Sequence, residues 1–430
     1  MSISQPTKAA IRRCIIGNVP HLNDRGIENF AIHAFRVYED ICKPYFTATL
    51  LIEDQMNNTD PYLYPAVNVE ISFESLPNNK KYTETFRIYS IESKPKGDDL
   101  YGGMLITINL IGEEYYNDVQ NTVMQSFDNK TAVSAAVEIH NTFISENGPI
   151  SATQSTGLIA TDKLPHMVQN LKPIKAIHDL LDKAISGTWT THAFTYFRNK
   201  QGYVIAPLQE LLTTSPILGN FVHNPASGSD LNKILAGYNE IIHLRPMAPP
   251  SQETAAGIRS VELDSLMKTS SFFDVKTGNL FNTSSTQGLQ KLVGTLAKIK
   301  STKGLSAIGK SLLKDTVKTK FGARMMFAVL NEDRQPRAID KHGPAGHNSQ
   351  EEAFVSALNH QKKYWISVPL QSGINITIGN RIKVVYPVNT KRTEKTLFVV
   401  RLVHEIQYKT PGSKNYEPVQ GTTDMYCIEW

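Results

Sequence analysis

The chain has 430 residues, of which 40% are hydrophobic, 9% aromatic and 20% charged. This length and composition predict roughly three globular domains and exclude a chain that is disordered throughout. The 45 basic and 40 acidic residues give a net charge of +5, which is too small by itself to indicate nucleic-acid binding.

Signals for membrane insertion, secretion and disulfide bonding are missing from the sequence. No stretch approaches the ~18–20 uncharged apolar residues that a membrane-spanning helix needs. The first fourteen residues lack an apolar segment followed by a small-residue cleavage site, so we expect no signal peptide. The cysteines Cys14, Cys42 and Cys427 are odd in number and far apart, which indicates maturation in a reducing cytosol.

Residues 1–122 alternate with the period of two that is typical of strands. β-branched and aromatic runs are separated by breaks rich in Pro, Gly and Asn; these runs are 46–54, 67–73, 82–89 and 104–111. Their spacing predicts an antiparallel sheet closed into a barrel or sandwich.

Residues 123–235 change to a mixed pattern and predict a small α+β domain. The segments 131–140 and 173–185 have helical patterns, and the second carries Pro173 in its first turn and Gly187 just past its end. Apolar runs at 193–197 and 203–207 flank the turn Asn199-Lys-Gln-Gly, which predicts a hairpin.

The last third of the chain is β-like again. Strand patterns predict a second β-domain formed by 236–280 and 356–430; they lie at 238–245, 258–264, 364–368, 381–386, 397–403 and 424–430. Two β-domains around an α+β domain indicate a duplicated barrel. Residues 281–355 are expected to form a basic, partly helical insertion, whose basic face either is simply solvated, docks on an acidic partner or contacts nucleic acid.

One motif in this insertion opens an alternative function. Gly304-Leu-Ser-Ala-Ile-Gly309-Lys310-Ser311 matches the phosphate-binding loop G-x-x-x-x-G-K-[ST]. Such a loop needs a preceding strand and a parallel sheet, whereas 292–299 has helical spacing and the flanking chain has an antiparallel β pattern. A nucleotide-binding protein that uses Gly304–Ser311 therefore remains the alternative to a structural protein.

Other candidate motifs do not predict chemistry. His404-Glu405 begins like a zinc-protease helix, but Tyr408 replaces the second histidine and the segment alternates like a strand. His342 and His347 lie beside Asp340 in a polar loop and are expected to be solvated. Acidic pairs such as Glu113-Glu114 are expected to lie on solvated faces. We therefore expect no catalytic residue, no metal ligand and no cofactor site.

The order and spacing of several segments resemble the baseplate hub proteins of contractile-tailed bacteriophages. The resemblance covers most of 30–280 and 360–430 and excludes 281–355. It rests on the following segments: Phe35-Arg-Val-Tyr38-Glu-Asp40, Pro44-Tyr-Phe-Thr-Ala-Thr, Leu105-Ile-Thr-Ile-Asn-Leu-Ile, Ala193-Phe-Thr-Tyr-Phe, Gly202-Tyr-Val-Ile-Ala-Pro, Gly257-Ile-Arg-Ser-Val-Glu-Leu-Asp264, Ile378-Gly-Asn-Arg-Ile-Lys-Val and Phe398-Val-Val-Arg-Leu-Val-His404.

This resemblance implies a mainly β fold with two tail-tube-like antiparallel barrels and no catalytic activity. It further implies a homotrimer that adapts a sixfold tail tube to a threefold central spike around the genome-ejection channel. The implied partners are the spike, tail-tube or tube-initiator proteins, the tape-measure protein and other baseplate proteins, with no sequence-specific nucleic-acid binding. The implied location is the tail baseplate of a virion assembled in the host cytoplasm.

Overall fold

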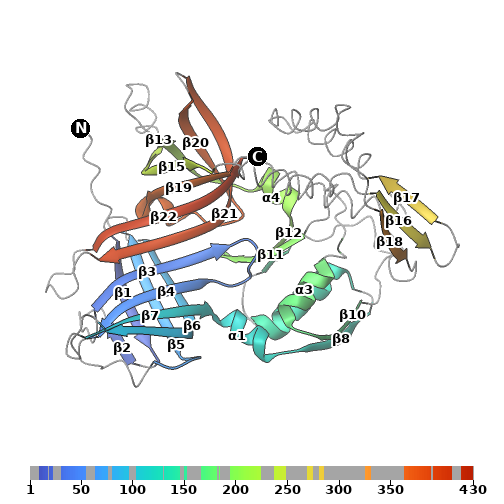
Figure 1. The fold of residues 1–430 in the computed structure, drawn as a ribbon, viewed down its shortest axis with the longest axis horizontal. Coiled ribbons are helices and arrows are strands. Elements are labelled where there is room, and N and C mark those ends of the chain that lie inside the picture. The colour runs from blue at the N-terminus through green and yellow to red at the C-terminus, as the bar shows by residue number, and fades with distance from the viewer. Residues whose placement is uncertain are drawn as a thin grey trace.

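In the computed structural model, two β-units stack on one another and a small α+β unit lies beside them (Figure 1). The described residues are 9–17, 19–22, 31–54, 63–75, 80–95, 103–128, 130–145, 150–152, 166–181, 184, 194–223, 237–247, 269–274, 280–284, 325–330, 363–388, 391–408 and 418–429.

The first β-unit is a curled sheet with the strand order β3-β4-β7-β6-β5-β1-β2. Its strands alternate inward apolar and outward polar side chains; in β3, Phe35 and Val37 are buried and Arg36 is exposed. Aromatic rings fill the curled interior, with Phe35 packing edge-to-face on Phe73 and Phe86. The strands are β1 (Ala9–Ile16), β2 (Val19–Leu22), β3 (Ala31–Asp40), β4 (Thr47–Asp54), β5 (Asn68–Ser75), β6 (Lys80–Pro95) and β7 (Met104–Gly112).

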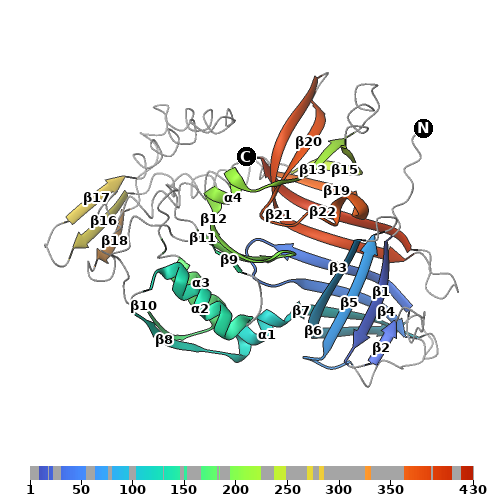
Figure 2. The same ribbon diagram turned by 180° about the vertical axis from the view of Figure 1, so that it is seen from behind.

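The second β-unit is a barrel that closes on itself (Figure 2). Its ladder runs β13-β20-β21-β22-β19-β15, and the adjacent segments β14 and β15 pair with β13 and β19 respectively, which joins the two ends. The elements are β13 (Ile217–His223), β14 (Asn239–Ile241), β15 (His243–Pro246), β19 (Lys363–Pro369), α11 (Leu370–Gly373), β20 (Arg381–Val388), β21 (Lys391–Tyr408) and β22 (Pro418–Glu429).

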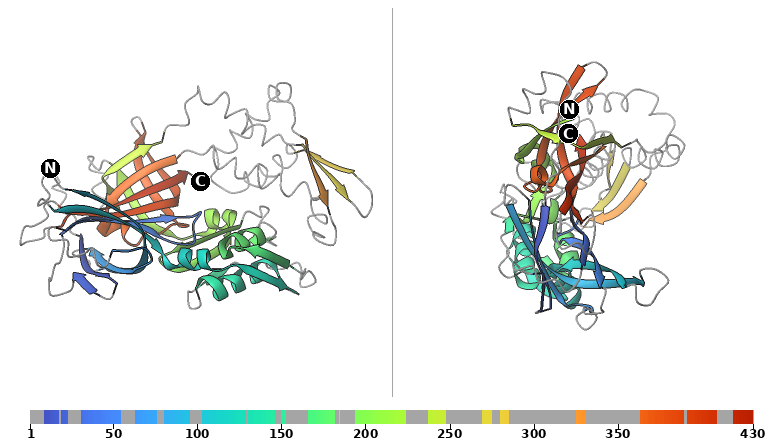
Figure 3. Two further views of the ribbon diagram at one scale, coloured as in Figure 1. Left: turned by 60° about the horizontal axis from the view of Figure 1, so that its bottom comes forward. Right: turned by 90° about the vertical axis from the view of Figure 1, so that its left-hand side faces the viewer.

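Strand β21 joins the two β-units into one sheet. Along one edge, its first half (391–398) pairs with β20 and its second half (401–407) pairs with β3. Arg36 bonds Glu405 at 2.7 Å and Arg401 lies 2.9 Å from Asp40 across the joint. Figure 3 shows the resulting stack, with the β20–β21 hairpin projecting beyond the barrel.

The middle unit packs two helices against small sheets. Thr131 caps α2 by accepting a hydrogen bond from the Ser134 amide, and Pro173 begins α3. The turn at 200–201 connects β11 and β12, as the sequence predicts. The elements are α1 (Glu113–Gln120), β8 (Val123–Phe127), α2 (Ala132–Ile139), the π-helix η2 (His140–Ile144), β9 (Ile150–Ala152), β10 (His166–Leu171), α3 (Pro173–Leu181), β11 (Phe194–Asn199), β12 (Gly202–Pro207) and α4 (Leu208–Thr214).

A buried histidine in this unit makes stability depend on pH. His140 lies at the start of η2, where its Nδ1 is 2.7 Å from the Tyr196 hydroxyl, and burial lowers its pKa to about 4. Near pH 6.5 the His140 ring takes up a proton in the unfolded state but not in the folded state. The stability that depends on the neutral ring is therefore fully present above pH 6.5 and declines as the pH falls toward 4. We expect a loss of about 3 kcal/mol from this residue across that window.

Chemical unfolding of the wild type and of His140→Gln at pH 7 and pH 4.5 measures this effect. The wild type should lose more stability than the variant between the two pH values. Equal losses in the two proteins would contradict the assignment.

Several strands lie elsewhere than the sequence pattern indicates. Residues 217–223, expected in the α+β domain, form β13 of the second barrel, where they pair in parallel with β20. The expected strand at 258–264 lies outside the described residues. A separate small sheet contains β16 (Thr269–Asp274), β17 (Leu280–Ser284) and β18 (Met325–Leu330), and its β16–β18 pair is parallel. The flanking chain is therefore not purely antiparallel, because long connections allow parallel neighbours that a local pattern cannot indicate.

The two β-units repeat one topology. Along the chain, β1, β3, β4, β5, β6 and β7 correspond to β13, β15, β19, β20, β21 and β22, and each corresponding pair has corresponding neighbours in the sheet. One difference is that β1 is antiparallel to β5 whereas β13 is parallel to β20.

The correspondence extends to single residues. The long strands β6 and β21 each change partner midway and each contain a register shift, between Ile88 and Ser90 and between Val399 and Arg401. The Ala66 amide bonds the Ile88 carbonyl, and the Gly379 amide bonds the Val399 carbonyl. Ala66 and Gly379 both have positive φ values, 70° and 77°. The pattern is therefore a structural duplication.

Candidate functional site

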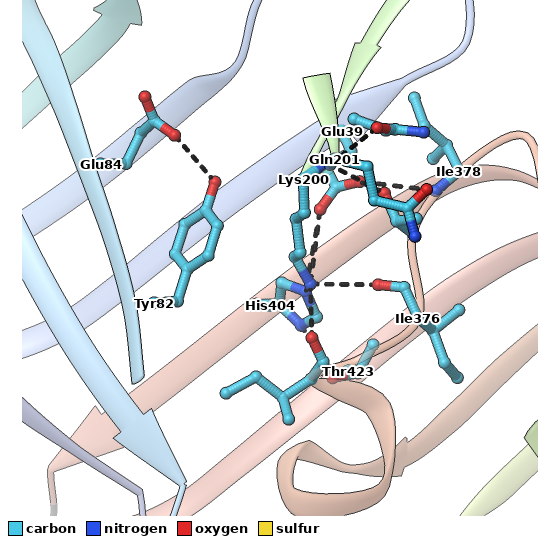
Figure 4. Close-up of polar contacts among 12 residues, drawn as sticks. Glu39, Tyr82, Glu84, Lys200, Gln201, Ile376, Ile378, His404 and Thr423 are labelled. Carbon is cyan, nitrogen blue, oxygen red and sulfur yellow. Dashed lines mark hydrogen bonds and ion pairs between the residues drawn. The ribbon is translucent and has the colours of Figure 1, made fainter. Parts of the chain in front are cut away.

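A buried polar cluster lies where the first β-unit, the middle unit and the second β-unit meet (Figure 4). We define the junction cluster as Glu39 of β3, Lys200 of the β11–β12 turn, Thr377 of the loop before β20, His404 of β21 and Thr423 of β22. The inward face of each alternating strand carries Glu39 and His404 into the interior, and the tight hairpin turn directs Lys200 toward them.

Lys200 is the centre of the junction cluster. Its ammonium donates to the carbonyl oxygens of Ile374 and Ile376 at 2.8 and 3.0 Å and to the Nε2 of His404. It lies 3.6 Å from Glu39 Oε1 and 5.5 Å from the centre of the Tyr82 ring. Burial lowers the pKa of Lys200, and the nearby Glu39 carboxylate opposes that shift.

The remaining groups of the cluster add further hydrogen bonds, whereas Glu39 Oε1 accepts none and lies only within ion-pair distance of Lys200. The Thr377 hydroxyl donates to Glu39 Oε2 at 2.7 Å. Since Lys200 donates to Nε2 of His404, that nitrogen is an acceptor, which assigns the ring proton to Nδ1 and a donated bond to Thr423 Oγ1 at 2.9 Å. Burial and the Lys200 charge lower the pKa of His404 well below its ordinary value, so the ring is neutral at pH 7.

A second ion cluster fixes the same hairpin to the first β-unit. Arg198 of β11 bonds Glu114 at 2.5 Å and Glu84 at 2.8 Å, and its guanidinium lies 4.5 Å from the centre of the Phe46 ring. The Tyr203 hydroxyl donates to the same Glu114 oxygen at 2.7 Å. Burial raises the pKa of Glu114, although Arg198 and Tyr203 oppose that shift.

These positions correct one interpretation of the sequence and confirm another. Glu114 is buried beneath Arg198 and is not on a solvated face, because the hairpin of the middle unit folds back over the start of α1. His404 does lie on a strand, as expected, and its ring is occupied by Lys200 and Thr423. The missed signal is charge at an inward position: Glu39 shares its strand face with Phe35 and Val37.

The described part of the chain contains no group of three or more His, Cys, Asp or Glu residues placed to hold a metal ion. None of the helices among these residues is long and apolar enough to cross a membrane. Cys14 and Cys427 are buried free thiols, and Cys42 is an exposed one. The Gly304–Ser311 motif, His342 and His347 lie outside the described residues, as does the basic segment 291–324.

The geometry of the junction cluster is that of a structural joint. A single ammonium donates to the second β-unit at Ile374, Ile376 and His404 and forms an ion pair with Glu39 of the first β-unit. A buried charge held in this way is costly to separate from its partners, so the cluster resists relative movement of the units. The cluster therefore fixes the orientation of the two β-units, and Lys200 is the residue that connects them.

No protein-family model matches the sequence, and no curated protein matches it. A tail protein from Neisseria meningitidis MC58 matches 99% of this chain over 97% of its own length, with a TM-score of 0.55 and 10% identity. The 43 kDa tail protein of prophage MuSo2 from Shewanella oneidensis matches 97% of this chain over 98% of its length, with a TM-score of 0.52 and 9% identity.

The chain has a tail-protein fold. This match confirms the predicted fold class, a mainly β architecture of the kind found in tail proteins. The sequence identities to these two tail proteins are only 10% and 9%, so the likeness lies in the fold. The junction cluster lies within this fold, between its two β-units.

Proposed function

We propose that the chain is a trimeric baseplate hub of a contractile phage tail. It joins the sixfold tail tube to the threefold central spike and surrounds the channel through which the genome leaves. The proposed partners are the spike, tail-tube or tube-initiator proteins, the tape-measure protein and other baseplate proteins. The proposed place of action is the tail baseplate of the virion, after assembly in the host cytoplasm.

The duplicated topology carries this proposal. Each chain has two β-units with corresponding strands, partner changes and register shifts. Three chains therefore supply six corresponding units, and a ring of such units presents approximate sixfold symmetry on one face while its true symmetry remains threefold. A component that connects structures of sixfold and threefold symmetry needs this property.

The buried joints support a structural and non-enzymatic role. The pairing of β3 with β21 holds the two β-units together, and the contacts of Lys200 and Arg198 hold them to the middle unit. A fixed angle between the two units is required if their corresponding faces are to be spaced evenly around a ring. The basic insertion at 281–355 is proposed to extend from the second β-unit.

Light scattering of the purified chain, with electron microscopy of the same sample, tests the proposal. We expect a particle of three times the 48.0 kDa chain mass with a threefold ring and an open centre. The nucleotide-binding alternative is tested in parallel by titration with ATP of the wild type and of Lys310→Ala. A compact 48 kDa monomer whose ATP binding disappears in Lys310→Ala would contradict the hub.

A further inference from the structure

The internal duplication identifies surfaces that correspond to the joint within the chain. The pairings of β6 with β5 and β7, and of β21 with β20 and β22, place Arg87 in correspondence with Phe398. The pairings of β3 with β4 and of β15 with β19 place Arg36 in correspondence with Arg245. Each half of the joint between β21 and β3 therefore has a counterpart, on β6 and on β15.

Within the chain, the β21 half of this joint is covered. The edge of β21 beyond β20 pairs with β3 from Arg401↔Asp40 to Gln407↔Ala34. The Ile41 amide bonds the carbonyl of Val400 in the register shift, and Thr377 is 1% exposed beneath Glu39 and Lys200.

The counterpart on β6 is open. β5 pairs with 80–87 only, so among the described residues the edge of β6 from Ser90 to Pro95 has no neighbour on that side. Tyr89 corresponds to Val400 and is 61% exposed, and Tyr64 corresponds to Thr377 and is 59% exposed. Tyr64 and Tyr89 are therefore large hydrophobic side chains that are exposed in the first β-unit, although the corresponding positions of the second β-unit are covered.

The counterpart of β3 is open as well. β15 pairs with β19 along one edge, and its other edge has no ladder partner in the described part of the chain. Ile242 and Met247 flank this edge, each 42% exposed. Met247 follows the strand, and its backbone amide donates to the Lys363 carbonyl. Its position corresponds to that of Tyr38 in the joint within the chain.

We propose that the open edge of β6, with Tyr64 and Tyr89, binds the β15 edge of a second copy of this chain. This contact repeats between copies the joint that β21 and β3 make within one copy. Because its two faces are different, the contact is heterologous and continues from copy to copy until a ring closes. This inference adds the contact surface between copies to the proposed function, and it rests on the proposed function only for the number of copies, which is three.

The joint between copies is weaker than the joint within the chain. Pro246, in correspondence with Val37, has no amide hydrogen to donate. Lys94 corresponds to Glu405 and therefore faces Arg245, where the joint within the chain has the Arg36–Glu405 ion pair. The contact consequently relies on the exposed aromatic and aliphatic side chains, and raising the salt concentration should strengthen it by screening the like charges.

Disulfide trapping tests the pairing directly. Val403 and Tyr38 are partners within the chain, so Glu92→Cys and Met247→Cys place thiols opposite one another between copies. The background is Cys42→Ser, which leaves two buried native thiols. We expect mild oxidation to give covalent trimers with this pair and none with the matched pair Met124→Cys and Met247→Cys, since Met124 is exposed like Glu92 but lies on the middle unit.

The substitution Tyr89→Glu is the second measurement. It should lower the trimer fraction at least tenfold at micromolar concentration, whereas Met124→Glu should leave it unchanged. A trimer by light scattering that neither forms the disulfide nor responds to Tyr89→Glu would overturn this pairing and leave the proposed hub intact. A chain that stays monomeric at 100 µM without any cross-link would overturn both.

Discussion

Replacing Lys200 by methionine is expected to lower the free energy of unfolding by about 3–5 kcal/mol. The substitution keeps an unbranched side chain of similar length and removes its charge, which leaves Glu39 buried without a cation 3.6 Å away. It also removes the donor for the carbonyl oxygens of Ile374 and Ile376. Urea unfolding followed by circular dichroism and intrinsic fluorescence measures the loss.

Two controls separate this charge effect from a general effect of losing a lysine. Lys175→Met removes a lysine whose ion pair with Asp179 is largely exposed, and it should cost less than about 0.5 kcal/mol. Adding Glu39→Gln to Lys200→Met should recover part of the loss, because the unpaired charge is then gone. If Lys200→Met is as mild as Lys175→Met, the junction cluster does not hold the units together.

Replacing Gly379 by alanine is expected to destabilise the fold by about 2–4 kcal/mol. Gly379 has a φ of 77°, a conformation that an L side chain adopts at a cost. A Cβ at this position would also lie 2.5 Å from the ring of the buried Phe197, so the middle unit would have to move away from the second barrel. The midpoint of thermal unfolding should fall accordingly.

The duplication supplies a matched control for this substitution. Ala66 occupies the corresponding position of the first β-unit with a φ of 70° and the same backbone hydrogen bond. Ala66→Gly relieves the strained conformation but increases the freedom of the unfolded chain, so the net change should stay within about 1 kcal/mol. A Gly379→Ala effect as small as this one would show that contact with Phe197 does not constrain the joint.

Much of the local structure could be predicted from the sequence. Alternating side chains at 46–54 and 104–111 indicate the strands that became β4 and β7, and Pro173 marks the start of a helix. These features depend on neighbouring residues, because the periods of two and 3.6 record which face of an element is buried. Two β-rich stretches around a mixed one likewise indicate that the chain contains two β-units.

The candidate site could not be predicted from these local sequence patterns. Lys200 reads as one residue of a polar turn, and Glu114 reads as one half of a surface acidic pair. Their burial depends on groups far away in the chain: Lys200 meets Glu39 and His404, and Glu114 meets Arg198. Sequence patterns show charge and period, but they do not show which distant carboxylate will lie within reach of which cation.

The sequence by itself therefore determined several of the elements, among them the strands β4 and β7, the helix that begins at Pro173 and the β11–β12 hairpin. Only the tertiary structure decided which edges meet: that β21 leaves β20 for β3, that β13 belongs to the second barrel, and that β6 keeps an open edge beside Tyr89. The physical reason is that strand edges are joined by backbone amide and carbonyl groups, which are nearly the same for every residue. Side chains specify the faces of a sheet, and the partner at each edge follows from how the whole chain packs.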